Sequence, residues 1–202
     1  MKVTLLTASS KEYWLLMALS APNKLEYCIR HGVQFAMNIH THIDAFKNWG
    51  ERELFMLDAL DAYDCDWLWF MGADTIITNQ TLDIRTLCDD EFDFIIGVDV
   101  NGINNDSFLL KNCKASRDFL KRVLCRRDAP HDQDAMFAEK DVSLKTKLVG
   151  QRTFNSYKYD EYGYGPFPEG TWQEGDFVLH VPGLHLVRRV QLMQEYLGKV
   201  KR

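Results

Sequence analysis

The chain has 202 residues, 46% of them apolar and 26% charged, and a mass of 23.5 kDa. This length favours one globular domain over residues 1–202, and the composition excludes a disordered or low-complexity chain. No stretch approaches the roughly 18 apolar residues that a membrane span needs, so we expect none.

The cysteine pattern indicates a cytoplasmic protein with reduced thiols. Five cysteines are an odd number, and no two of them form a CxxC pair. The N-terminal residues, MKVTLLTASSKEYW, carry one early lysine and only a short apolar run, which is not the pattern of a signal peptide. We therefore expect a soluble protein that works in the cytoplasm.

The net charge of -5 is unevenly distributed. The first 100 residues hold 7 Lys and Arg against 16 Asp and Glu, whereas the remaining 102 hold 17 against 13. Residues 111–127 contain seven basic side chains and a single acid, Asp118. Two interpretations stay open, an anionic partner bound by this segment or an ordinary solvated helix face.

The first third of the chain predicts alternating strands and helices. Residues 3–7 form a short apolar run typical of a buried strand, and residues 33–39 predict a second one. Between them, residues 13–30 have helical spacing, and Gly32 is a helix stop. Because Pro22 interrupts this segment, one helix and two shorter ones are both open.

The next segment predicts a helix followed by a buried strand. Over residues 49–63 the spacing predicts a helix, and residues 66–71 are almost entirely apolar, as in a strand covered on both faces. The expected inward side of the helix carries Leu54, Leu57, Ala59 and Leu60, and its expected outward side carries Glu53, Asp58 and Asp61.

The second half predicts further strands and helices of the same kind. Strands are expected at 92–98, 107–110, 142–148 and 177–181, and helices at 114–126, 134–138 and 186–200. Strands that alternate with helices indicate an α/β layered sheet.

Three polar positions next to these elements are candidates for chemistry. Asp74 emerges directly from the buried strand, where a cation would offset its desolvation, although it could equally cap the next turn. His180 lies at the end of a predicted strand, before a Pro-Gly turn. It could be a metal ligand or an ordinary core histidine. Residues 131–134, HDQD, precede an apolar helix and could simply form its N-terminal cap.

Five segments, taken in order, resemble a known family. They are WLWFMGADTIITN (67–79), VNGINNDSFLLKNCKASRDFL (100–120), HDQDAMF (131–137), QRTFNSY (151–157) and GDFVLHVPG (175–183). Together they resemble the galactosyl-, mannosyl- and xylosyltransferases of the GMA type. The resemblance implies a GT-A fold, a mixed sheet flanked by helices in a single domain. It also implies a retaining glycosyltransferase that takes its sugar from a UDP-sugar with Mn²⁺ or Mg²⁺. Because no membrane span is expected here, unlike in the eukaryotic members of the family, we expect an enzyme of a bacterial or viral type.

The resemblance also implies roles for individual residues. Asp74 would be the last acid of a DxD motif and a metal ligand, with His180 as the further ligand. Around the donor, Thr7 and Ala8 would meet the nucleoside, Tyr13 the base, Gly183 the diphosphate and Asn104 the transferred sugar. Asp132 and Gln133 would be catalytic, beside the anomeric carbon. On this basis residues 1–100 would form the nucleotide-sugar half and residues 101–202 the acceptor half.

Three positions depart from the family pattern. Gly72 stands where the first acid of the DxD motif is expected, so a carboxylate is missing unless Asp99 or a water substitutes for it. His185 stands where relatives often carry a lysine, and if protonated it would neutralise a diphosphate. Asp106 stands where relatives tend to have glycine.

The basic second half suggests the acceptor. Lys114, Arg117 and Lys121 would contact a phosphate backbone, and the aromatic residues of 154–159 and 162–165 would stack on a sugar or a flipped base. The leading hypothesis is transfer to a hydroxymethylated base of viral or phage DNA. The alternatives are a glycan or lipid-linked saccharide acceptor, and an inactive relative or nucleic-acid-binding module.

Overall fold

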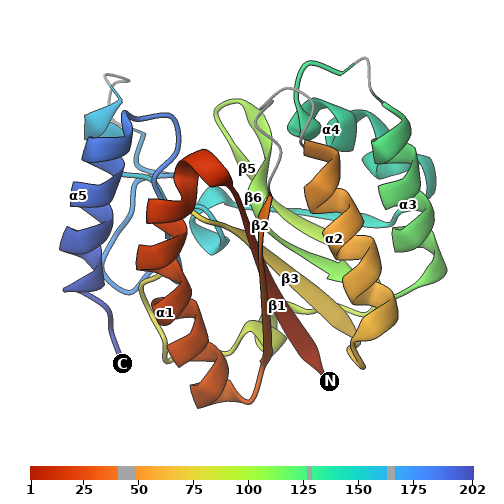
Figure 1. The fold of residues 1–202 in the computed structure, drawn as a ribbon, viewed down its shortest axis with the longest axis horizontal. Helices are drawn as coiled ribbons and strands as arrows, with labels where there is room; N and C mark the ends of the chain where they lie inside the picture. Colours follow the sequence, from red (N-terminus) through yellow and green to blue (C-terminus); the bar gives the residue numbers. More distant parts are fainter. Residues whose placement is uncertain (41–48, 127–128, 163–166) are drawn as a thin grey trace.

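The computed structural model describes residues 1–40, 49–126, 129–162 and 167–202, and its centre is a six-stranded mixed sheet between two helical layers (Figure 1). The strand order is β2-β1-β3-β6-β5-β7. The strands are β1 (Val3–Ser10), β2 (Gln34–His40), β3 (Trp67–Gly72), β5 (Phe94–Asp99), β6 (Gly102–Lys111) and β7 (Thr146–Val149). The predicted α/β sheet flanked by helices is confirmed.

Strands β1, β2 and β3 run parallel, whereas β6 runs antiparallel to both β3 and β5. All six residues of β3 are buried, which confirms the strand covered on both faces. Side chains of neighbouring residues in β3 alternate between two cores: Leu68 and Phe70 face one, Trp67 and Trp69 the other. The strands β1 and β3 end side by side, with Ala8 opposite Gly72.

One face of the sheet is covered by α1 (Trp14–His31), which is a single helix. Gly32 ends it in the left-handed conformation, with φ of 62°. The helix continues through Pro22, and the next residue, Asn23, bonds the backbone of Ile77 twice: Nδ2 donates to the carbonyl at 3.0 Å, and Oδ1 accepts from the N–H at 2.8 Å. Tertiary contacts therefore outweigh the local cost of the proline, and two shorter helices are not formed.

The opposite face is covered by α2 (Trp49–Ala62), α3 (Lys114–Cys125) and α4 (Asp132–Ser143) (Figure 1). In α2 the predicted faces are wrong at two positions. Leu54 is 50% exposed, and Glu53 is fully buried. Met56, Ala59 and Leu60 point into the core at helical spacing, and Glu53 lies inside because it pairs with the adjacent Arg52.

The predicted strand over residues 142–148 is also partly wrong. Helix α4 continues through Ser143, and the strand β7 begins only at Thr146. Arg122 of α3 donates to Ser143 Oγ at 2.6 Å and to Glu139 Oε2 at 3.0 Å, so a neighbouring helix holds this turn in helical form.

A separate two-stranded ladder joins distant parts of the chain. Strand β4 (Thr75–Ile77) pairs antiparallel with β8 (Val178–His180), and Thr75 lies opposite His180. Helix α5 (Leu186–Leu197) follows β8 and packs beside α1. A third apolar cluster, including Leu16, Ile76 and Leu192, fills the space between these elements. Four short 3-10 helices complete the described structure, at Lys11–Tyr13, Ile84–Leu87, Gln151–Thr153 and Tyr159–Glu161.

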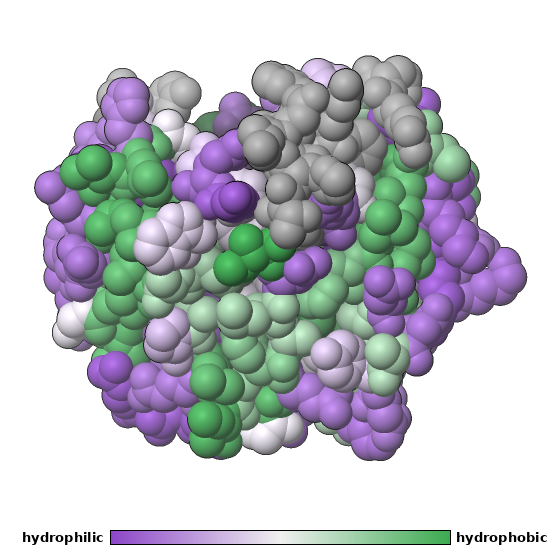
Figure 2. Space-filling model, viewed as in Figure 1, coloured by the Kyte–Doolittle hydropathy of each residue, from purple (hydrophilic) through white to green (hydrophobic). Residues whose placement is uncertain are grey.

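Hydrophobic residues gather on the surface over α1 and α5, with hydrophilic residues along the outer edges of the same face (Figure 2). Trp14 and Ile29 of α1 and Val187 of α5 are more than half exposed. Among the described residues no helix combines the length and the apolar character needed to cross a membrane.

Candidate donor and metal site

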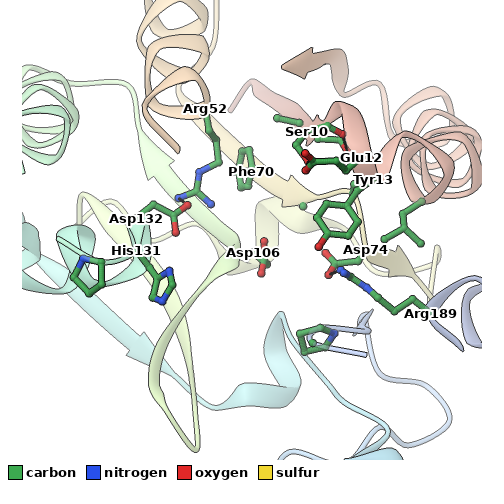
Figure 3. A pocket seen from close by; sticks show the side chains of 18 residues that line it. Ser10, Glu12, Tyr13, Arg52, Phe70, Asp74, Asp106, His131, Asp132 and Arg189 are labelled. Atoms are coloured by element: carbon green, nitrogen blue, oxygen red, sulfur yellow. Dashed lines mark hydrogen bonds and ion pairs between the residues drawn. The ribbon is translucent and has the colours of Figure 1, made fainter. Parts of the chain in front are cut away.

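A cavity of about 440 Å³ opens where β1 and β3 end (Figure 3). Parts of the chain that are far apart in sequence contribute its walls. Its lining includes Ala8, Ser10, Glu12, Tyr13, Arg52, Phe70, Gly72, Asp74, Asp106, His131, Asp132, Gly183 and Arg189. Open α/β sheets bind ligands at such carboxyl ends of strands, so the position and the size both suit a small organic ligand.

Two carboxylates that line one side of the cavity, those of Asp74 and Asp106, lie against the buried imidazole of His180. His180 Nε2 lies 3.2 Å from Asp106 Oδ2 and 3.4 Å from Asp74 Oδ2. One potential ligand atom from each residue falls within 4.8 Å of the others. The ladder of β4 and β8 creates this arrangement, and the Val181 N–H also donates to the Asp74 carbonyl at 3.0 Å.

The pKa values of His180 and Asp74 are strongly shifted by the charges around them. Burial by itself lowers the pKa of His180, but the nearby carboxylates of Asp74 and Asp106 outweigh it and raise that pKa to about 9. Burial by itself raises the pKa of Asp74, but His180 and Arg189 outweigh it and hold that pKa below its usual range. The Asp74 carboxylate is therefore ionised at neutral pH.

The donor set of this cluster fits a divalent cation. Carboxylate oxygens with one imidazole suit hard or borderline ions such as Mg²⁺ or Mn²⁺. His180 is fully buried, and neither of its ring nitrogens has an aligned hydrogen-bond partner among the described residues. A buried imidazole that faces two carboxylates without an aligned hydrogen bond is an arrangement that a bound cation would complete.

Asp99 does not supply the carboxylate that is missing at Gly72. Its Oδ2 instead accepts from the Tyr157 hydroxyl at 2.6 Å and from Asn104 Nδ2 at 2.9 Å. Asn104 is thereby fixed behind the cavity, is 4% exposed, and accepts from the Asp106 N–H at 3.1 Å through Oδ1. These bonds orient the strand that carries Asp106.

A buried lysine supports the turn after β3. Lys24 Nζ donates to the Gly72 carbonyl at 2.6 Å, to Thr7 Oγ1 at 3.0 Å and to Ser20 Oγ at 3.3 Å. Burial lowers the pKa of Lys24 to about 7, against the opposing effect of Asp74. The sequence analysis missed this role, although Lys24 and Ser20 are one helical turn apart and so share a face.

The other side of the cavity is formed by an ion pair between two helices. Arg52 Nη2 lies 2.7 Å from Asp132 Oδ2 and 2.8 Å from Glu53 Oε1, and its guanidinium lies 5.0 Å from the centre of the Phe70 ring. Burial raises the pKa of Glu53 to about 7 despite the adjacent Arg52. Figure 3 shows Asp106 between this pair and the pair of Asp74 and Arg189.

A second cation, Arg189 of α5, was not predicted in this position. It forms an ion pair with Asp74, and its guanidinium lies 5.0 Å from the centre of the Tyr13 ring. His185, the predicted cation, is an exposed residue at the start of α5 and is not part of the cavity lining. Gly183 lies in the lining with φ of 66°, a conformation that suits glycine.

The predicted donor residues divide into two groups. Ala8, Tyr13, Asp74, Asp132 and Gly183 line the cavity. In contrast Thr7, Asn104, Gln133, His180 and His185 are outside its described lining, and Thr7 Oγ1 is used in a 2.7 Å bond to the Met71 carbonyl. Contact of any of these residues with a donor stays a prediction.

The predicted acceptor residues lie on α3, away from the cavity lining. Arg117 donates to Asp61 Oδ1 at 3.0 Å and to the Leu60 carbonyl at 2.7 Å, and Lys114 pairs with Asp118 at 2.5 Å. Lys121 is exposed on the same helix. Ion pairs within the protein therefore account for most of this charge and favour the solvated helix face. Of the predicted aromatic loop, residues 163–166 lie outside the described residues.

The sequence profile of the galactosyl transferase GMA12/MNN10 family matches residues 2–90 and 84–190. The chain belongs to this family. It is 25% identical to an uncharacterized alpha-1,2-galactosyltransferase of Schizosaccharomyces pombe, C637.06, over 91% of this chain and 67% of that protein. It is also 26% identical to the probable xyloglucan 6-xylosyltransferase 3 of Arabidopsis thaliana, over 59% of this chain and 30% of that protein. The chain thus spans less than a third of the length of this plant relative.

Solved structures share the fold of this family member. A glycosyltransferase involved in glycosylation of the major capsid of PBCV-1 superposes with a TM-score of 0.76 at 15% identity, over 95% of this chain and 99% of that one. The galactosyltransferase LgtC superposes with a TM-score of 0.64 at 11% identity, over 98% and 96%. These similarities confirm the predicted GT-A fold.

Proposed function

We propose that the chain is a metal-dependent glycosyltransferase that moves a sugar from a UDP-sugar to a hydroxyl group of a glycan. The observation that carries this proposal is the juxtaposition of Asp74, Asp106 and His180 at one side of the 440 Å³ cavity. Family membership supports the same activity, because relatives are named as galactosyl- and xylosyltransferases.

The cavity offers a place for each part of the donor. Ala8 and Tyr13 would contact the nucleoside, and Gly183 would let the chain approach the diphosphate closely. Asp74 and His180 would hold Mn²⁺ or Mg²⁺, which supplies Lewis-acid stabilisation of the leaving diphosphate. Arg189 would add a second positive charge near the phosphates, in exchange for its pairing with Asp74.

The opposite side suits the sugar and its reacting carbon. Arg52 keeps the Asp132 carboxylate paired and oriented at the cavity. A fixed carboxylate stabilises the positive charge that develops on an anomeric carbon as the bond to the leaving group breaks. Asp132 is therefore a proposed catalytic residue. The catalytic role of the adjacent Gln133 and retention of configuration are proposed from the family resemblance alone.

A glycan acceptor is favoured over DNA. The relatives named above include a xyloglucan xylosyltransferase, and one structural neighbour takes part in glycosylating a capsid protein. The basic residues on which the DNA hypothesis depended are largely paired with acids of the same chain. A modified base of viral or phage DNA stays a prediction and becomes a second acceptor in the test.

The experiment measures transfer of radiolabelled sugar from UDP-galactose, UDP-xylose and UDP-glucose with Mn²⁺, Mg²⁺ or EDTA. The acceptors are an oligosaccharide panel and duplex DNA that contains hydroxymethylated bases. We expect transfer to a saccharide that EDTA abolishes and that Asp74→Asn reduces at least about 100-fold. If no donor gives either sugar transfer or UDP release, the proposal is overturned in favour of an inactive relative. Transfer to DNA alone would replace the glycan with DNA as acceptor.

A further inference from the structure

The space that a side chain at position 72 would need is already occupied by a carboxylate. A β-carbon added to Gly72 would lie 2.6 Å from Asp106 Oδ1, closer than real β-carbons approach other atoms, and 3.3 Å from Asp106 Cγ, which is a tight contact. The strand register explains this proximity. In the antiparallel ladder of β3 and β6, Met71 lies opposite Ser107, so Gly72 and Asp106 extend the ladder side by side.

This carboxylate belongs to the same cluster as the two predicted metal ligands. Asp106 Oδ2 lies 3.2 Å from His180 Nε2, on the side that also faces Asp74. The buried imidazole of His180 has no aligned hydrogen-bond partner among the described residues, and its Nε2 points toward both carboxylates. Asp106 is about one-third exposed, so it reaches the cavity from the strand β6.

We propose that Asp106 replaces the acid that is absent at Gly72, so that Asp74, Asp106 and His180 together form a three-residue site for a divalent cation. In this chain the carboxylate comes from the neighbouring strand β6 instead of from the end of β3, but it enters the same space. This inference rests on the proposed function, in which the cation holds the donor diphosphate. It also predicts that glycine and aspartate can be exchanged between positions 72 and 106 when both are changed together, but not when only one of them is changed.

The experiment is a titration of the purified chain with Mn²⁺ alone and again with UDP, in which the electron paramagnetic resonance signal reports free Mn²⁺. Because removal of outer-shell partners alone costs about 10–100-fold in metal affinity, loss of a direct ligand in Asp106→Asn should weaken Mn²⁺ binding at least tenfold. The matched control Asp58→Asn removes one exposed carboxylate from α2 and should leave the affinity unchanged.

The exchange of positions 72 and 106 supplies the sharper test. Gly72→Asp alone should not improve Mn²⁺ binding, because the new side chain meets Asp106. Asp106→Gly should weaken it as Asp106→Asn does, and the double variant Gly72→Asp with Asp106→Gly should restore it to within about threefold of the original chain. Circular dichroism on each variant identifies any that fails to fold.

The outcomes separate this inference from the proposed function. The inference is overturned if Asp106→Asn binds Mn²⁺ as tightly as the original chain whereas Asp74→Asn binds it more weakly. That result would leave the transferase proposal intact. Absence of Mn²⁺ binding by the original chain, with and without UDP, would overturn the inference as well. If the variants show the expected changes in Mn²⁺ affinity but the original chain transfers no sugar, the three-residue site is supported and the proposed activity is refuted.

Discussion

Arg52 Nη2 lies 2.7 Å from Asp132 Oδ2, which joins α2 to the first residue of α4 across one wall of the cavity. Arg52 is 8% exposed and is held in place by Glu53 and by the ring of Phe70. The position of the Asp132 carboxylate is therefore set by side chains that do not themselves depend on a bound donor.

Asp132→Asn should lower kcat for sugar transfer by about 100-fold, because the neutral amide stabilises developing positive charge less well. The KM for the UDP-sugar should change much less, since the fold and the diphosphate end of the cavity are untouched. Steady-state kinetics with the preferred donor measure both constants. Asp134→Asn, an exposed position on the same helix, is the control, and an equal loss of kcat in the two variants would contradict the role of Asp132.

Arg189→Met should weaken binding of UDP about tenfold, because the diphosphate loses its nearest cation on α5. Isothermal titration with UDP in the presence of Mn²⁺ measures this affinity. The control is Arg188→Met, which removes the neighbouring charge that pairs with Glu161 outside the cavity lining. Unchanged affinity for UDP in Arg189→Met would show that the arginine serves only as the partner of Asp74.

Asn23→Ala should lower the free energy of unfolding by about 2–3 kcal/mol, because it removes two buried bonds to the backbone of Ile77. Urea denaturation measures the change. Glu26→Ala, which removes ion pairs at the surface of the same helix, should cost only about 0.5 kcal/mol. Equal effects of the two changes would mean that the hydrogen bonds of Asn23 do not stabilise the packing of α1 against β4.

Lys24 makes stability depend on pH in a defined direction. Its pKa is about 7 in the folded chain and about 10.4 when unfolded, so between these values the unfolded chain binds more protons. Stability of the original chain should therefore rise from pH 7 to pH 9 relative to Lys24→Met, by about 2 kcal/mol. Urea denaturation at both pH values tests this, and a pH-independent difference between the two chains would contradict it.

Much of the fold follows from local sequence patterns. The strand β3 was predictable because the five consecutive apolar residues 67–71 need cover on both faces, and Gly32 marks the end of α1. In contrast, the interior position of Glu53 depends on ion pairs that form only in the tertiary structure. The same is true of the end of α4, which Arg122 fixes from another helix.

The candidate site was predictable in part for a similar reason. Asp74 and His180 could be selected because each lies at the end of an apolar strand, and they do come together. The cations that pair with the carboxylates at this site could not be selected. Arg52 and Arg189 lie on helices whose orientation toward the cavity depends on how the helices pack, and spacing along the chain does not encode that contact.

Because the ladder of β4 and β8 joins segments that are distant in sequence, we expect the site to form late in folding. Asp74 and His180 are distant in sequence, and their approach requires the segment around residues 178–180 to dock beside residues 75–77. Closing such a long loop carries a large entropic cost and slows the formation of the contact. During synthesis a ribosome-bound chain would have its main sheet strands available before it could assemble the cation site. Ability to bind the cation would therefore distinguish a fully folded chain from one whose last segment is still undocked.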